Sequence, residues 1–197
     1  MRGLATLALV GALAALGAGC SSPPAKFYTL SSVAEPGSSS SNISVVVGPV
    51  SVPPVIDRPQ IVVTTGPNQV VVDEFSRWAS PVQDNLARVV ADDLGAALGT
   101  PRVTLYQSPL GAEVDYRVQI EVRTFESAPG KYAALDALWS VRRINDGKTE
   151  TGHTILRVSV DGEGFDALAA AHSRGVAKMS KEIADRVRLL AGSAQPM

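Results

Sequence analysis

Apolar and polar residues alternate through three successive runs between residues 116 and 160, and no other pattern in the sequence limits the possible folds as much. A period of two places one set of side chains on a buried face and the other in water, as in half-buried antiparallel strands. The connections between the runs are short, and the Asp146-Gly147 pair in the second is typical of a hairpin turn. The sequence therefore predicts an antiparallel meander, with these residues facing the core: Tyr116, Val118, Ile120, Val122, Leu135, Ala137, Trp139, Val141, Thr154, Leu156, Val158 and Val160.

Two amphipathic helices are predicted, one before and one after this meander. In the first, Ser80 is expected to be the N-cap, Pro81 the first helical residue and Gln83 the partner in a capping box, while Gly99 and Pro101 end the helix. Its apolar stripe comprises Val82, Leu86, Val89, Val90, Leu94, Ala97 and Leu98. The stripe of the second comprises Phe165, Leu168, His172, Val176, Met179, Ile183, Val187 and Leu190. Two such helices need a sheet face to cover, so the predicted class is α/β: two layers, with a mixed, largely antiparallel sheet covered by two long amphipathic helices.

Shorter apolar runs in the N-terminal half predict further strands. Phe27–Leu30 is expected to be the first strand, followed by a flexible loop over Ser31–Asn42, whose Ser, Pro and Gly content cannot bury enough apolar surface to order itself. A β-branched run at 43–52 predicts the next strand. Runs at 60–65 and 69–75, separated by Gly-Pro-Asn, predict a hairpin.

Cys20 is the only cysteine in the sequence, and it follows a short apolar run. The run from Leu4 to Leu16 is about a dozen residues long, whereas a membrane-spanning helix needs roughly 20. With Arg2 before it and small residues after it, the run is typical of a secretory signal peptide. Its end at Cys20 resembles the lipobox of bacterial lipoproteins, in which the cysteine becomes the N-terminus and carries a diacylglycerol and an N-acyl chain. The alternative is a buried thiol in an uncleaved apolar helix.

This interpretation divides the chain into a signal peptide at 1–19, a lipid-anchored linker at 20–26 and one domain at 27–192. Ser21 follows the cysteine, whereas Asp at that position is the usual inner-membrane retention signal of Gram-negative lipoproteins. The predicted location is therefore the outer membrane, on its periplasmic face, with the acyl chains as the only attached groups.

No catalytic or metal-binding residues are predicted. The only histidines are His153 and His172; with Cys20 acylated, no His/Cys metal cluster is available. His172 lies on an apolar helix stripe and is expected to be a partly buried packing residue, and its neighbour Ser173 points about 100° away on the same helix. The formal net charge is −1 and aromatic residues are scarce, which disfavours a nucleic-acid partner. The function is expected to be non-enzymatic.

Three motifs in the first half of the chain indicate a family. They are "FYTL" at 27–30, "VGPVSVPPVIDRPQIV" at 47–62 and "RWASPVQDNL" at 77–86. With the lipobox Cys20, they resemble the PqiC (YmbA-like) family of ABC-type transport auxiliary lipoproteins. This resemblance implies an outer-membrane lipoprotein encoded with MCE-domain proteins and involved in moving lipids between the two membranes. It implies an MCE-domain protein as partner, leaves homo-oligomerisation open and supplies no catalytic residues.

The candidate partner-binding residues are Arg58, Pro59 and Trp78. The prolines in "VPPVIDRPQ" remove amide donors and hold the backbone extended, so the segment suits a recognition element or a rigid surface connection better than a central strand. For Trp78 the alternative is a hydrophobic staple onto the following helix. Two functions stay open: a tether or docking subunit of an MCE-type lipid transport system, and an assembly or stabilising lipoprotein for another envelope complex.

Overall fold

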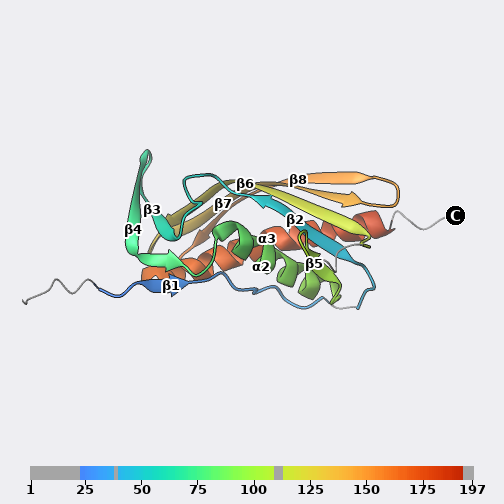
Figure 1. Ribbon diagram of the computed structural model, residues 1–197, viewed down its shortest axis with the longest axis horizontal. Helices are drawn as coiled ribbons and strands as arrows, with labels where there is room; N and C mark the ends of the chain where they lie inside the picture. Colours follow the sequence, from blue (N-terminus) through green and yellow to red (C-terminus); the bar gives the residue numbers. More distant parts are fainter. Residues whose placement is uncertain (1–22, 38–39, 109–112, 193–197) are drawn as a thin grey trace, which may run out of the picture.

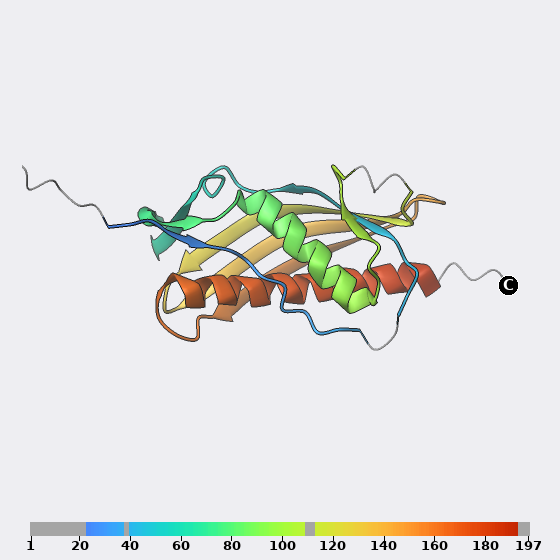
Figure 2. The same cartoon turned by 60° about the horizontal axis from the view of Figure 1, so that its bottom comes forward.

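A five-stranded sheet with two helices against one of its faces forms the body of the molecule (Figures 1 and 2). The computed structural model describes residues 23–37, 40–108 and 113–192. In the order in which they lie in the sheet, the strands are β5 (Val103–Leu105), β2 (Val45–Ser51), β6 (Tyr116–Ala128), β7 (Tyr132–Arg143) and β8 (Thr149–Ser159). The predicted α/β class is confirmed.

The predicted meander forms the larger part of this sheet. Strands β6, β7 and β8 pair antiparallel, with Val118 opposite Val141 and Leu135 opposite Leu156. The side chains predicted to face the core are buried, apart from Leu156, which is half-buried. Strand β2 adds a mixed character, because it runs parallel to both β5 and β6.

Helix α2 (Val82–Leu98) packs against β2 and the second helix, and its predicted apolar stripe is fully buried. The predicted capping box is wrong. Pro81 has a ψ of 133°, which is extended, so Pro81 itself is the N-cap and no side chain caps the helix. Ser80 thus lies one residue too early to fill that role. The C-terminal end agrees with the prediction, since Gly99 adopts the left-handed conformation at φ 63°.

Helix α3 (Gly164–Gly192) runs along the length of the molecule and covers β7 and β8 (Figure 2). Seven of the eight predicted stripe residues are buried, and Phe165 is half-buried at the start of the helix. At the other end, the buried Arg143 of β7 donates hydrogen bonds to Asp146 and to the Leu190 carbonyl, which ties the β7–β8 turn to α3. The guanidinium lowers the pKa of the Asp146 carboxyl to about 2.

A second, three-stranded sheet lies at the end of the molecule where the described chain begins (Figure 1). Its order is β1 (Lys26–Tyr28), β4 (Gln69–Trp78) and β3 (Gln60–Gly66). The predicted β3–β4 hairpin is confirmed, and β1 joins it parallel to β4. Strand β4 extends three residues beyond the predicted run because it bends where Asp73 accepts hydrogen bonds from the backbone of Phe75 and Ser76 and then continues.

The described part of the predicted flexible loop 31–42 is instead held against the helices (Figure 2). Gly37 N–H donates to the Ala96 carbonyl (2.8 Å), and the Ser41 hydroxyl donates to the Leu98 carbonyl (2.8 Å). The last carbonyls of a helix have no partners within the helix, so this segment satisfies groups that would otherwise need water. Its order comes from backbone partners rather than from apolar burial, which is why composition suggested disorder.

Candidate functional site

The segment Pro53–Pro59 connects β2 to β3 as a compact exposed turn. Ile56 N–H donates to the Pro53 carbonyl (3.1 Å), and Asp57 N–H donates to the Pro54 carbonyl (3.3 Å). Ile56 is buried in the core and anchors the turn. The segment is therefore a rigid surface connection, and that geometry also presents a fixed surface to a partner.

Arg58 and Pro59 are both exposed on this turn. The Arg58 side chain makes no hydrogen bond or ion pair with any residue that the structure describes, so its charge faces water. Trp78 lies next to them in the backbone, because its N–H donates to the Pro59 carbonyl (2.7 Å). The structure thus brings the backbones of the three predicted residues close together, and the side chains of two of them lie on the surface.

The Trp78 side chain points the other way, into the core, and is only 5% exposed. Its ring centroid lies 6.1 Å from that of Phe125 and 6.2 Å from that of His172. Trp78 therefore packs onto β6 and α3 and is removed from the candidate binding surface. Arg58 and Pro59 are left as the exposed candidates.

His172 has a polar partner that sequence analysis missed. Its Nε2 lies 2.8 Å from the Ser127 hydroxyl, and its ring stacks on Phe125 at 3.9 Å. Ser127 is separated from His172 by 45 residues in the sequence. The one sequence signal for a buried Ser127 was that it lies two residues after the inward-facing Phe125. The predicted partial burial is an underestimate, since His172 is fully buried.

A serine hydrogen-bonded to a histidine is half of a nucleophilic triad, so this pair has to be tested as one. Both residues are about 2% exposed, so no substrate can reach the hydroxyl. The His172 Nδ1 has no hydrogen-bond partner among the described residues, whereas a catalytic base is oriented by one there. Burial also lowers the pKa of His172 to about 3, so the ring is a poor proton acceptor at neutral pH. The pair is a packing element of the core.

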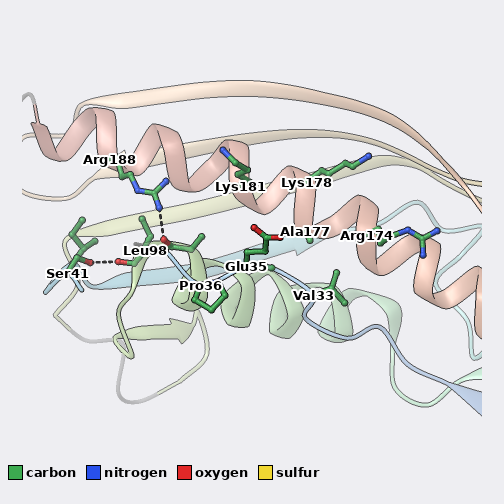
Figure 3. A pocket seen from close by; sticks show the side chains of 14 residues that line it. Val33, Glu35, Pro36, Ser41, Leu98, Arg174, Ala177, Lys178, Lys181 and Arg188 are labelled. Atoms are coloured by element: carbon green, nitrogen blue, oxygen red, sulfur yellow. Dashed lines mark hydrogen bonds between the residues drawn. The ribbon is translucent and has the colours of Figure 1, made fainter. Parts of the chain in front are cut away.

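A groove of about 660 Å³ lies between residues 33–37, the end of α2 and one side of α3 (Figure 3). Arg188 reaches across its end and donates to the Ala97 carbonyl of α2. Most of the side chains that line it are Val33, Glu35, Pro36, Ile43, Leu98, Arg174, Ala177, Lys178, Lys181 and Arg188. Four cations beside apolar side chains raise the question of an anionic ligand.

Three of these four cations already have carboxylate partners. Arg174 pairs with Asp161 at 3.0 Å, while Lys181 and Arg188 share Asp185 at 3.0 and 2.7 Å. Within the described chain only the fourth cation, Lys178, lacks a partner. The Glu35 carboxylate lines the same groove. The groove therefore offers no preformed cluster of unpaired cations to a phosphate or carboxylate.

The remaining sequence predictions concern metals and the membrane. In the part of the chain that the structure describes, no three His, Cys, Asp or Glu residues gather as metal ligands would. None of the described helices is both long and apolar enough to cross a bilayer. Cys20, the predicted lipidation site, lies outside the described residues.

One protein-family model, that of the ABC-type transport auxiliary lipoprotein component, matches residues 28–184. The chain belongs to this family. The match confirms the resemblance to PqiC (YmbA-like) proteins that the motifs at 27–30, 47–62 and 77–86 indicated. As a family member, the chain is a lipoprotein component auxiliary to ABC-type transport. No curated protein sequence matches this chain.

Two solved structures share the fold of this family member. A crystal structure of an uncharacterized protein is similar with a TM-score of 0.69 and 21% identity, covering 84% of this chain and 99% of that chain. The crystal structure of a Xanthomonas campestris protein of the family DUF330 is similar with a TM-score of 0.60 and 20% identity, covering 80% of this chain and 92% of that chain. At these identities the likeness shows the architecture alone.

Proposed function

We propose that this chain is an outer-membrane lipoprotein subunit of an MCE-type intermembrane lipid transport system, in which it acts without catalysis as a tether or docking component. The observation that carries the proposal is the position of Cys20, eight residues before the start of the family match at Tyr28. A lipobox cysteine so close to the domain supplies the anchor that the family description implies. The proposed acylation adds three chains, and each buried methylene contributes about 0.8 kcal/mol, so attachment is effectively permanent.

The docking surface in this proposal is the turn Pro53–Pro59, with Arg58 as its exposed charge. A turn that its prolines and its internal hydrogen bonds already hold loses little conformational entropy when a partner binds. Arg58 has no competing ion pair within the described chain, so a partner carboxylate would not have to displace one. The proposed partner is the periplasmic end of an MCE-domain protein.

The experiment is co-purification of the full-length, acylated protein from membranes in mild detergent, with its partners identified by mass spectrometry. Arg58→Glu is expected to weaken recovery of the MCE-domain protein while changing the free energy of unfolding by no more than about 0.5 kcal/mol, because an exposed charge contributes little to folding. Arg142→Glu is the matched control: Arg142 is exposed on β7, close to the β7–β8 turn at the other end of the molecule.

Equal recovery of the partner with Arg58→Glu and wild type would reject Arg58 as a contact. Unfolding of the Arg58→Glu variant would show that Arg58 is structural. Recovery of a different envelope complex, without any MCE-domain protein, would replace the proposal with the alternative of an assembly or stabilising lipoprotein.

A further inference from the structure

Exposed apolar side chains gather at the end of the molecule where the described chain begins. Twelve large apolar side chains are exposed in the described residues, and five of them lie in β1, in β4 or in the adjoining proline turn. Four belong to the small sheet itself: Phe27, Val70, Val71 and Phe75. The other seven are spread over the rest of the described chain, so this sheet is where such residues concentrate.

The strand register places the two phenylalanines on one face. Lys26 pairs with Ser76 and Phe27 with Arg77 across β1 and β4. Ser76 and Trp78 are buried, so the alternating Phe75 and Arg77 point away from the core, as does Phe27. Phe27 is 64% exposed and Phe75 is 44% exposed. Two aromatic rings thus stand in water on the outer face of adjacent strands, a costly arrangement unless something covers them.

The β3–β4 hairpin continues this apolar surface outward. It projects from the body of the molecule, as Figure 1 shows, and Val70 and Val71 near its turn are each about half exposed. Successive residues of a strand face opposite sides, so exposure of both means that neither side is covered there. The hairpin and the aromatic face form one exposed apolar end.

The chain between Cys20 and Phe27 limits how far this end can lie from the anchor. Seven residue steps separate the two positions, and an extended chain spans at most about 3.6 Å per residue, or about 25 Å in all. If Cys20 is acylated, as the proposed function requires, Phe27 cannot leave the neighbourhood of the lipid surface. Tethering at such a distance makes contact with lipid an intramolecular event, so even a weak contact is populated.

We propose that the outer face of the β1-β4-β3 sheet, through Phe27 and Phe75, rests on the lipid surface to which the chain is anchored. Phenylalanine on the apolar face of a surface-bound element is buried at the boundary between headgroups and acyl chains, where the ring is withdrawn from bulk water. Arg77 shares the outer face with the rings and places a cation at the level of the lipid phosphates. Arg58 precedes β3, at the opposite edge of the sheet from β1, so docking and lipid contact use different strands.

The test uses full-length protein expressed with its anchor and reconstituted into phosphatidylethanolamine–phosphatidylglycerol vesicles. Phe27→Cys, Phe75→Cys and the control Ile155→Cys are each labelled with a nitroxide. Ile155 is 67% exposed on β8, in the other sheet. Because Cys20 is the only native cysteine and acylation blocks its thiol, an acylated variant takes one label per chain. Collisions of the nitroxide with oxygen, which partitions into lipid, and with a water-soluble nickel chelate then report its depth.

The expected result is a gain of oxygen collisions and a loss of nickel collisions at positions 27 and 75, with position 155 remaining in water. Labels at 27 and 75 that collide with nickel as often as the label at 155, in protein that floats with vesicles and carries one label, would overturn this inference alone. Two labels per chain and no flotation would show that Cys20 is not acylated, and would overturn the proposed function together with this inference.

Discussion

Trp139 of β7 packs directly against the backbone of Gly152 on β8. The two residues are paired across the strands, and the indole lies over the place where a side chain at 152 would stand. The indole N–H donates to the Thr154 hydroxyl (2.9 Å), and that hydroxyl contacts Glu182 of α3. Gly152 therefore leaves room for an indole that is linked, through the Thr154 hydroxyl, to helix α3.

Gly152→Ala is expected to lower the free energy of unfolding by about 1–3 kcal/mol, the usual cost of overpacking a core. The added Cβ would lie 2.1 Å from the Trp139 ring, so the indole would have to move and give up its hydrogen bond. Urea unfolding measures the change. Gly175→Ala in α3 is the control, because its Cβ would meet Val158 at an ordinary 3.6 Å. Equal stability of the two variants would show that the indole has room to shift.

The buried His172 predicts a dependence of stability on pH. Its pKa is about 3 in the folded chain and close to 6.5 when unfolded. Between these values the unfolded chain binds the proton and the folded chain does not, so the free energy of unfolding falls as the pH falls below about 6.5. This residue contributes up to about 1.4 kcal/mol per pH unit in that window.

His172→Gln is expected to remove that contribution while keeping a polar group near the Ser127 hydroxyl. From pH 6.5 to pH 5, wild type should lose up to about 2 kcal/mol more stability than the variant. Urea unfolding at the two pH values gives the comparison, and His153 cancels because both proteins contain it. The same pH slope in both proteins would mean that His172 is protonated in the folded state.

The contact of residues 31–37 and 40–42 with α2 is the main feature at the scale of elements that composition did not indicate. Gly37 lies so close to the end of α2 that an added Cβ would be 2.1 Å from the Ala97 carbonyl oxygen. The approach lets its N–H reach the Ala96 carbonyl. One glycine therefore lets the segment pack against α2, where residues 33–37 line the groove of Figure 3.

Gly37→Ala is expected to detach this segment from α2 and leave the rest of the fold in place. Amide hydrogen exchange should become faster at positions 37 and 41, whose N–H groups donate to α2 and to Gly99, with little change in β6–β8. Gly66→Ala at the end of β3 is the control, since its Cβ would meet Gln69 at 3.7 Å. Unchanged exchange at 37 and 41 would contradict a role for the close approach.

The elements that could be predicted are those whose pattern is local. The alternation of apolar and polar residues predicted the three strands of the meander, and the apolar stripes at 3.6-residue spacing predicted both helices. Each pattern depends only on neighbours in the sequence. Periodicity does not encode contacts between residues tens of positions apart. Such contacts include the parallel pairing of β1 with β4 and of β2 with β6, the Ser127–His172 bond and the capping of α2 by Gly37. Of the candidate site, Arg58 and Pro59 are exposed as the proline pattern suggested. Trp78 is not, because its position in β4 turns it inward.

At the scale of the whole molecule, the proposed location depends on the residue after Cys20, the proposed lipidation site. Ser21→Asp is expected to move a substantial fraction of the protein from the outer to the inner membrane, because Asp at that position is the usual retention signal. Membrane fractionation measures the shift. Cys20→Ala is the control, in which acylation and processing by signal peptidase II should both be lost. Unchanged fractionation of Ser21→Asp would count against this sorting rule here, and labelled palmitate in Cys20→Ala would reject Cys20 as the lipidation site.

Helix α3 spans the molecule from the end that carries β1 to the end that carries the β7–β8 turn (Figure 1). With 29 residues at 1.5 Å each it is about 43 Å long, and Arg143 fastens its far end to the sheet. A chain anchored at one end is thus a spacer of fixed length, which cannot shorten without breaking its core. The height that an anchored chain reaches above the membrane is therefore limited by a single helix, so inserting or deleting whole turns of α3 and the paired strands would change that reach.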